Sequence, residues 1–258
     1  MKYIIVGGAG FIGSHFIDLI LQEPNVEVIV VDNFFLGSEE NLATARGRFK
    51  NRLKVYKEDA DNFYGMSNII GQEKPDIVVN FATKALLYSF DNPAEAMKIN
   101  VDIILNLLES LRYKKYDRLI HLSTSEVFGT AMQISMNEDH PIRPETTYAA
   151  GKAAADLTIQ SYINMFELDV ITLRPFNNYG PRQNKAALAA VIPITINRIL
   201  QGLSPILEGD GTQTRDFIYV EDTVKIIRKF IEFNPKAHRE FNIGTGEEIS
   251  ILKLVNNI

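Results

Sequence analysis

A glycine-rich segment directly after a short apolar run constrains the fold of this chain more than any other feature. Gly7, Gly10 and Gly13 lie in Gly-Gly-Ala-Gly-Phe-Ile-Gly, and an amphipathic stretch follows at once. Glycines at this spacing permit positive φ, close approach of a pyrophosphate and tight packing of a helix on a strand. The helix start adds free N–H groups and a positive dipole end. We therefore expect a dinucleotide site lined by these glycines, Phe11 and Ile12.

Short apolar runs alternate with amphipathic segments along most of the chain. Apolar runs of this kind suit strands that are buried on both faces. The alternation predicts an α/β fold, a Rossmann-like doubly wound parallel sheet with right-handed crossovers. The expected strands are 3–6, 26–31, 53–56, 77–81, 118–122 and 170–173, and the expected helices are 12–22, 62–71, 94–112 and 147–166.

The rhythm changes near residue 175, where proline and glycine begin to separate shorter elements. We expect residues 1–174 to form the dinucleotide-binding domain with the catalytic residues. Residues 175–258 are expected to form a smaller substrate-binding region interleaved with the sheet. Helices over 187–201 and 220–233 are predicted there, and they still pack on the sheet in this interpretation.

Composition and charge exclude several classes of function. The chain has 27 basic and 32 acidic residues, a formal charge of −5, so general attraction to nucleic acid or anionic lipid is not expected. It contains no cysteine, which excludes disulfides and thiolate chemistry and fits a cytoplasmic protein. Its four histidines show no metal-ligand spacing, so no metal site is expected. No uninterrupted apolar run is long enough to predict a membrane span.

An acidic residue follows the second predicted strand, about twenty residues beyond the glycine loop. Asp32, in Val-Val-Asp-Asn, can accept hydrogen bonds from both adenosine ribose hydroxyls and would repel the 2′-phosphate of NADP. The cofactor predicted is therefore NAD, with Asn33 beside the ribose. Asp59, with Ala60 after it, follows the third strand and can accept a hydrogen bond from the adenine amine.

A phenol and an ammonium lie four residues apart on the predicted helix 147–166. Tyr148 and Lys152 therefore share a helix face. Because a free phenol ionises near pH ~10, it needs a nearby cation to act as a base, and we expect Lys152 to lower its pKa. Three hydroxyls and a carboxylate, in Ser-Thr-Ser-Glu at 123–126, follow the fifth strand at the edge where open α/β sheets bind ligands.

Six motifs, in order along the chain, carry a resemblance to a known family. The sequence resembles the extended short-chain dehydrogenase/reductases that epimerise, dehydrate or decarboxylate nucleotide sugars. The resemblance covers essentially the whole chain, and its motifs are GGAGFIG, VDN, HLSTSEVFG, YAAGK, LRPFNNYGPRQ and GDGTQTRDFIYVED.

The resemblance implies a reaction through a 4-keto sugar. Tyr148 would take the proton of the sugar C4 hydroxyl while NAD accepts hydride from C4, with Lys152 tuning Tyr148 and Thr124 holding the same hydroxyl. The pair Ser125 and Glu126 then bears on the product. Glu126 matches the base that removes the C5 proton in 4,6-dehydratases, and Ser125 departs from the aspartic acid of the dTDP-glucose branch.

A nucleotide-sugar 4,6-dehydratase is therefore the favoured function, with a 4-epimerase or a UDP-glucuronate decarboxylase as alternatives. A non-catalytic dinucleotide sensor on the same fold is the alternative from a different class. A sugar-unrelated alcohol dehydrogenase is disfavoured by the TRDF and NNYGPR segments.

Further site residues follow from the same resemblance. Family members usually continue for several tens of residues beyond this length, so we expect a C-terminally truncated substrate region. The two long helices are expected to pair with a second copy as a homodimer. A side-chain hydrogen bond to a neighbouring loop is expected for Asn100, within the cofactor site. The other cofactor contacts expected are Phe81, Ala82, Thr83, Ser123 and Pro175, and the expected contacts with the substrate diphosphate or sugar are Asn177, Asn178, Arg182 and Arg215.

Overall fold

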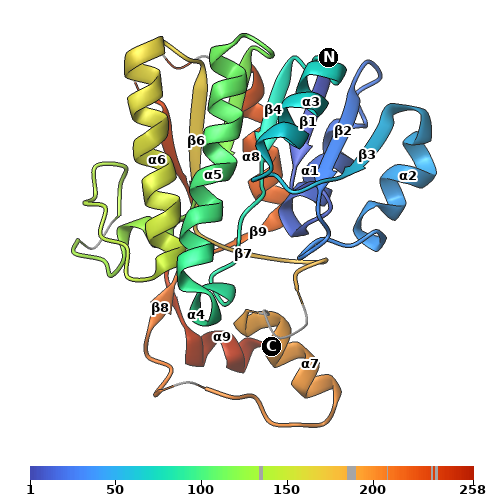
Figure 1. Cartoon of the computed structure of the whole chain (residues 1–258). Coiled ribbons are helices and arrows are strands. Elements are labelled where there is room, and N and C mark those ends of the chain that lie inside the picture. The colour runs from blue at the N-terminus through green and yellow to red at the C-terminus, as the bar shows by residue number, and fades with distance from the viewer. Residues whose placement is uncertain (134–135, 185–189, 208, 234, 236–237) are drawn as a thin grey trace.

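A seven-stranded parallel sheet forms the centre of the protein (Figure 1). The computed structural model describes residues 1–133, 136–184, 190–207, 209–233, 235 and 238–258. The strand order across the sheet is β10-β6-β5-β4-β1-β2-β3, and every neighbouring pair is parallel. The strands are β1 (Lys2–Val6), β2 (Glu27–Asp32), β3 (Leu53–Lys57), β4 (Ile77–Asn80), β5 (Arg118–Leu122), β6 (Val170–Pro175) and β10 (Glu240–Ile243).

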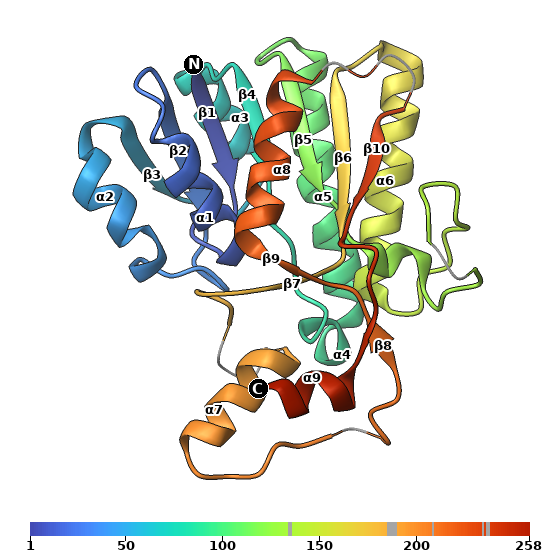
Figure 2. The same cartoon turned by 180° about the vertical axis from the view of Figure 1, so that it is seen from behind.

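Helices cover both faces of this sheet, as Figures 1 and 2 show. One face carries α1 (Phe11–Ile20) and α8 (Val220–Glu232), which pack on each other. The other face carries α3 (Phe63–Glu73), α5 (Pro93–Arg112) and α6 (Thr147–Phe166), of which α5 and α6 pack together along their length. The helix α2 (Ala43–Phe49) lies beside β3. The predicted doubly wound α/β fold is therefore confirmed, and no end of the strands and helices predicted before residue 175 is displaced by more than two residues.

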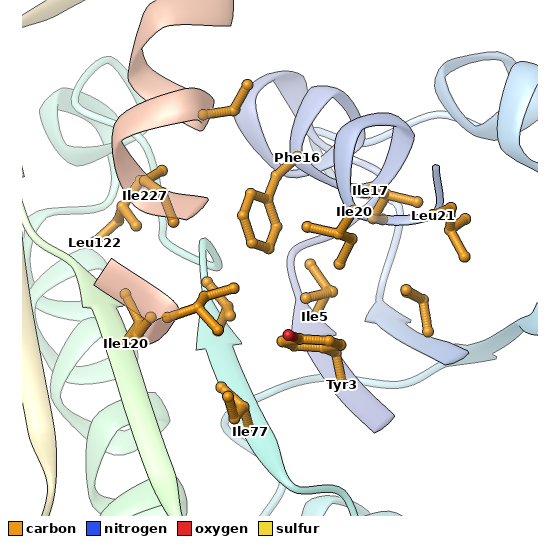
Figure 3. Packing of buried hydrophobic residues seen from close by; sticks show 14 of the residues in the cluster. Tyr3, Ile5, Phe16, Ile17, Ile20, Leu21, Ile77, Ile120, Leu122 and Ile227 are labelled. Atoms are coloured by element: carbon orange, nitrogen blue, oxygen red, sulfur yellow. The ribbon is translucent and has the colours of Figure 1, made fainter. Parts of the chain in front are cut away.

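Two apolar cores lie between the sheet and the helix layers on its two faces. Side chains alternate across each strand, so Ile5 packs toward α1 while Ile4 and Val6 pack toward α5. Figure 3 shows the first core, in which Phe16 of α1 and Ile227 of α8 lie over the strands. Because both faces are covered, the strands read as nearly continuous apolar runs rather than as alternating ones.

The chain diverges between β1 and β4. From β1 it proceeds to β2 and β3 on one side, and later to β4, β5, β6 and β10 on the other. Loops leaving β1 and β4 therefore move apart at the carboxyl edge of the sheet, which is where doubly wound folds bind ligands. The register places Val6 beside both Val31 and Asn80, so the ends of β1, β2 and β4 lie level.

The region after residue 175 contributes to two parts of the molecule. The helix α8 and the strand β10 return to the main sheet. A smaller lobe lies beyond the carboxyl ends of the strands (Figures 1 and 2). Residues 187–189 of the predicted helix over 187–201 lie outside the described residues. The elements of this lobe and its connections are β7 (Asn177–Tyr179), β9 (Phe217–Tyr219), β8 (Thr214–Arg215), β11 (Ile249–Ser250), α7 (Val191–Leu200), α9 (Ile251–Asn257) and, in its approach to the sheet, α4 (Tyr88–Asp91).

Among the described residues, no helix combines the length and the apolar character that a bilayer span requires.

Candidate active site

A cavity of about 380 Å³ opens at the carboxyl edge of the sheet, where β1 and β4 diverge. Its volume is within the range of small-molecule sites. It brings together most of the residues that the sequence predicts for the cofactor and for catalysis. The predicted residues in its lining are Gly7, Gly10, Phe11, Ile12, Gly13, Asp32, Asn33, Ala60, Phe81, Ala82, Thr83, Ser123, Thr124, Tyr148, Lys152 and Pro175, together with Asn178 and Arg182.

The glycine loop is tightly packed, and two of its positions admit no side chain. Gly7 has φ of +73°, and a Cβ atom there would lie 2.6 Å from the backbone nitrogen of Ala82. A Cβ atom on Gly13 would lie 2.5 Å from the carbonyl oxygen of Gly7. The backbone of the loop therefore comes close to the β4 loop on one side and to α1 on the other, as a phosphate-binding turn requires.

The first turn of α1 offers unpaired N–H groups to the cavity. Gly10 is the N-cap of α1 and provides no side chain to cap it, and the first turn contains no acidic residue. The backbone N–H groups of Phe11, Ile12 and Gly13 therefore lack intrahelical acceptors. Together with the helix dipole they form a site suited to an anion such as a pyrophosphate.

Asp32 connects the glycine loop to the end of β2. One carboxylate oxygen accepts a hydrogen bond from the Ala9 N–H at 2.9 Å, and the other accepts from the Phe34 N–H at 2.8 Å. Burial raises the pKa of Asp32, and these two hydrogen bonds lower it. These two hydrogen bonds hold the carboxylate in place. Because each oxygen has a second lone pair, the carboxylate can still accept hydrogen bonds from hydroxyl groups in the cavity.

The residues expected around the adenine are only partly in the lining. Asn33 lines the cavity and donates from Nδ2 to Asp59 Oδ1 at 2.6 Å. Asp59 itself does not line it, although its neighbour Ala60 does. The Ala60 carbonyl accepts a hydrogen bond from Asn106 of α5 at 3.0 Å, which fixes this loop against the helix layer.

A cluster of three side chains beside the cavity has no function predicted from the sequence. It consists of Lys84, Phe35 and Tyr88. The Lys84 ammonium lies 4.0 Å from the Phe35 ring centroid and 5.1 Å from that of Tyr88. Lys84 and Phe35 line the cavity. This cation–π contact joins the loop after β2 to the loop after β4. Phe35 and Lys84 are 49 residues apart in sequence and belong to no short motif, so the sequence alone gives no signal for this contact.

Asn100 of α5 holds the loop after β4 through hydrogen bonds. Its Oδ1 accepts hydrogen bonds from the Thr83 hydroxyl at 2.9 Å and from the Lys84 N–H at 3.0 Å. The expected hydrogen bond to a neighbouring loop is confirmed. Asn100 is absent from the cavity lining, so its contact with the site passes through Thr83 and Lys84.

Tyr148 and Lys152 lie on the first turns of α6, which begins where Thr146 caps the N–H of Ala149 at 3.1 Å. Lys152 is 2% exposed, and its ammonium donates to the carbonyl oxygen of Leu122. Burial lowers the pKa of Lys152 to about 8, against an opposing contribution from Asp156.

The expectation that Lys152 lowers the pKa of Tyr148 is wrong. Burial, with a smaller contribution from the charge of Glu126, raises the pKa of Tyr148 to about 12. The groups that lower it are the hydroxyls of Thr124 and Thr83, which hydrogen-bond the phenol. The Lys152 ammonium donates to the Leu122 carbonyl of β5.

Thr124, Ser125 and Glu126 follow β5 as a short 3₁₀ turn. The Thr124 hydroxyl accepts a hydrogen bond from the Glu126 N–H at 3.2 Å and caps this turn. Thr124 lines the cavity, whereas Ser125 and Glu126 do not. Glu126 is nevertheless close enough to Tyr148 for its charge to affect the phenol.

A buried ion pair connects α6, which carries Tyr148 and Lys152, to the sheet. Arg174 Nε donates to Asp156 Oδ2 at 2.8 Å, and both side chains are at most 1% exposed. The same oxygen accepts the Ser123 hydroxyl at 2.9 Å, and Arg174 also faces Glu240 of β10. This network ties α6 to β5, β6 and β10. Sequence analysis missed Asp156 and Arg174, because a single charge inside a helix or a strand resembles a surface residue.

A second cavity, of about 300 Å³, adjoins the first through Asn178, which lines both. Asn177 and Arg215 line the second cavity. The side-chain amides of Asn177 and Asn178 donate to backbone carbonyls, at 3.1 Å in each case. Arg182 is bound instead to Asp18 of α1, at 2.6 Å, although it also lines the first cavity.

The fold and the site define a class of protein. A doubly wound sheet with a glycine-rich turn after β1, an acid after β2, and a tyrosine and lysine four residues apart beside the cavity is the arrangement of the extended short-chain dehydrogenase/reductases. The family model described as GDP-mannose 4,6 dehydratase matches residues 4–258. The chain belongs to this family of NAD-dependent epimerases and dehydratases.

Individual relatives in this family have different names. The chain is 35% identical to a putative UDP-glucose 4-epimerase of Methanocaldococcus jannaschii, over 99% of this chain and 80% of the relative. It is 31% identical to UDP-glucuronic acid decarboxylase 6 of Arabidopsis thaliana, over 100% of this chain and 73% of the relative. A crystal structure of a dTDP-glucose 4,6-dehydratase from Streptomyces venezuelae, with NAD bound, superimposes with a TM-score of 0.91 at 30% identity, covering 100% of this chain and 80% of that chain.

The packing of the glycine loop leads to a stability prediction. Gly7→Ala is expected to lower the free energy of unfolding by at least ~1 kcal/mol, because it combines positive φ with a backbone clash. Gly47→Ala is the matched control, since a Cβ atom in α2 meets nothing within 4 Å, and it should leave stability unchanged or raise it. Urea denaturation measures both. Equal stability of the two variants would contradict this description of the loop.

Proposed function

We propose that this protein is an NAD-dependent nucleotide-sugar enzyme that acts through a 4-keto intermediate, and that it is a 4,6-dehydratase. The observation that carries the proposal is the meeting of Thr124, Tyr148 and Lys152 in one cavity with the glycine cradle and Asp32. A dinucleotide sensor has no need of this second group of residues. The names of the relatives support nucleotide sugars as the substrate class.

The described residues fit NAD. The glycine loop and the free N–H groups of α1 suit a pyrophosphate, and the Asp32 carboxylate can accept ribose hydroxyls and would repel a 2′-phosphate. Phe81, Ala82, Thr83, Ser123 and Pro175 line the part of the cavity next to Tyr148 and Lys152, which we assign to the nicotinamide end. When bound, NAD supplies a reversible hydride acceptor for the sugar C4 and a positive charge beside the phenol.

Tyr148 is assigned as the base that takes the proton of the sugar C4 hydroxyl. Its pKa of about 12 means that it keeps its proton at neutral pH unless a cation lies nearby. Thr124 hydrogen-bonds the phenol and is placed to hold the same sugar hydroxyl. Lys152 remains largely protonated at neutral pH, with its pKa of about 8, and can donate to a ribose hydroxyl.

Glu126 favours dehydration over epimerisation. Once C4 is a ketone, the C5 proton becomes acidic, and a carboxylate next to Tyr148 can remove it while the C6 hydroxyl leaves as water. Ser125, adjacent in the same turn, is assigned to assist the departing hydroxyl. A 4-epimerase needs no such carboxylate, and a UDP-glucuronate decarboxylase loses carbon dioxide from the same ketone. These two activities are the alternatives.

The second cavity is assigned to the substrate diphosphate and its nucleoside. Arg215 supplies a planar guanidinium suited to paired phosphate oxygens. The second amide hydrogens of Asn177 and Asn178, which also line this cavity, are further donors for an anion. Arg182 pairs with Asp18 through Nη2, whereas its Nη1 has no hydrogen-bond partner among the described residues, so we keep it as a candidate ligand of the substrate at the edge of the first cavity.

We also propose that the protein is a homodimer in the cytoplasm. Apolar side chains on the outer faces of α5 and α6 support the dimer: Met97 is 43% exposed and Leu157 is 54% exposed. The lack of cysteine agrees with a reducing compartment.

Incubation with a panel of UDP-, GDP- and dTDP-sugars tests the proposed activity. The expected product has lost one water, whereas loss of carbon dioxide would identify a decarboxylase and an unchanged mass with an altered epimer would identify an epimerase. Tyr148→Phe should lower turnover by about 10²–10⁴-fold while NAD binding persists, because the base is removed and the cofactor contacts remain. Near-normal turnover by this variant would refute the assigned base.

Glu126→Gln separates the dehydratase from the epimerase. In a dehydratase this substitution should reduce water loss by about 10²–10⁴-fold, since the C5 base is gone while C4 oxidation remains. Glu145→Gln is the matched control, because Glu145 accepts a hydrogen bond from the Thr130 N–H through an oxygen that glutamine retains. Equal rates for the two variants, measured by mass spectrometry of the product, would count against Glu126.

Leu157→Glu is expected to yield monomers, because it places a charge at the centre of the proposed α5–α6 interface. Leu252→Glu, on α9, is the control with a comparably exposed leucine, at 41%. Light scattering after size exclusion measures the mass of each variant. A native protein that is monomeric, or a Leu157→Glu variant that remains dimeric, would contradict the proposed interface.

A further inference from the structure

A line of buried polar side chains runs from the β4 loop to Lys152 and is not used in the reaction described above. Asn80, at the end of β4, is fully buried, and His121 of β5 is 1% exposed. The two residues are paired directly in the sheet register. Polar groups buried this deeply need hydrogen-bond partners, so their partners determine what each group does.

The orientation of the Asn80 amide follows from a backbone contact. The N–H of Ala82 donates to Asn80 Oδ1 at 3.1 Å, and a backbone N–H can only donate. The atom that faces His121 is therefore Nδ2, which can also only donate. It lies 3.0 Å from His121 Nδ1. His121 Nδ1 must therefore accept this hydrogen bond and carries no proton.

The protonation of His121 is fixed by the same contact. Burial, together with the charges of Lys152 and Arg174, holds the pKa of His121 well below its usual range, so the ring is neutral. A neutral ring without a proton on Nδ1 has its proton on Nε2. His121 Nε2 lies 3.4 Å from Lys152 Nζ. The imidazole therefore presents a donor, not an acceptor, to the ammonium.

Among the described residues, this arrangement leaves Lys152 one acceptor in the interior. The ammonium has three N–H donors, and the Leu122 carbonyl accepts one of them. Because His121 Nε2–H cannot accept, the other two are available to the cavity that Lys152 lines. The opposite tautomer would accept a second donor and turn the ammonium into the interior.

We propose that Asn80 and His121 are positioning residues that keep the Lys152 ammonium directed at the cofactor site, by holding His121 in its Nε2–H tautomer. The proposal rests on the proposed function, because the group that would use these donors is the ribose of NAD. It predicts that the cofactor affinity depends on the tautomer of a histidine that touches no ligand.

The same contact relates the charge of Lys152 to pH. A neutral amine can accept the His121 Nε2–H, whereas an ammonium cannot, so this contact favours loss of the proton from Lys152. The sign agrees with a lowered pKa, for which burial is the main cause. Other charged or titratable groups around the pair are Tyr148 and Asp156 on α6, Arg174 on β6, Glu240 on β10 and Glu126 in the turn after β5.

Asn80→Asp reverses the tautomer with almost no change of shape. Its carboxylate can still accept the Ala82 N–H, but its other oxygen must accept from His121 Nδ1–H, which leaves Nε2 as an acceptor for the ammonium. NAD affinity should fall about tenfold at neutral pH, the worth of one hydrogen bond to a charged group. The alkaline loss of NAD binding should move up by about one pH unit, because the ammonium gains a partner.

Thr172→Val is the matched control. Thr172 is buried on β6 directly beside His121 in the sheet register, and its hydroxyl has no hydrogen-bond partner among the described residues. This variant changes the packing next to His121 without changing its tautomer. NAD affinity and its pH dependence should match those of the native chain.

Two measurements test the proposal in the full chain. Nitrogen-15 NMR of the histidines in the native protein without NAD should show His121 protonated on Nε2 alone, and Asn80→Asp should show it protonated on Nδ1. Calorimetric titration with NAD from neutral to alkaline pH gives the affinities. A native His121 protonated on Nδ1 would overturn the proposal even if Asn80→Asp fails to fold. A reversed tautomer with unchanged NAD affinity would also overturn it, whereas a native chain that does not bind NAD would overturn the proposed function first.

Discussion

The divergence of the chain between β1 and β4 is the constraint on which the rest of the structure depends. Since all seven strands are parallel, every strand ends at the same edge of the sheet, and only at this point do the following loops move apart. The glycine loop after β1, the Asp32 turn after β2 and the Ala82 loop after β4 consequently surround one cavity. The close backbone contact between Gly7 and Ala82 shows how little space this convergence leaves.

The side of the cavity that carries Tyr148 and Lys152 depends on buried charge rather than on backbone. Lys152 is nearly inaccessible to solvent, and it lies above the Asp156–Arg174 ion pair that joins α6 to the strands. Removal of one member of a buried pair typically costs about 3–5 kcal/mol, so this network fixes the position of α6 strongly. The polar contacts of Ser123 with Asp156, and of His121 with Asn80, extend the same support to β5 and β4. The same buried polar network therefore determines both the position of α6 and the environment of Lys152.

The sequence predicts the fold, and it predicts most of the residues that line the first cavity, for identifiable reasons. Strands buried on both faces read as apolar runs, and the glycine spacing and the Tyr148–Lys152 spacing are local patterns that one element carries alone. What it could not predict depends on contacts across elements. The stacking of Lys84 on Phe35 and the pairing of Arg182 with Asp18 join residues far apart in sequence. The pKa of Tyr148 was expected to be lowered by Lys152, but the direction in which the ammonium points is set by β5, which no spacing within α6 reveals.

The central claim is that the reaction proceeds by removal of hydride from the sugar C4 and its return to the same molecule. A nucleotide sugar that carries deuterium at C4 tests this claim most directly, with the product examined by NMR after a single turnover. A 4,6-dehydratase should deliver the deuterium to C6 of the product, and the label should be retained if the same bound cofactor accepts and returns the hydride. Loss of the label to solvent would contradict hydride transfer to and from the cofactor. A product that still carries the label at C4 would contradict the assignment as a 4,6-dehydratase.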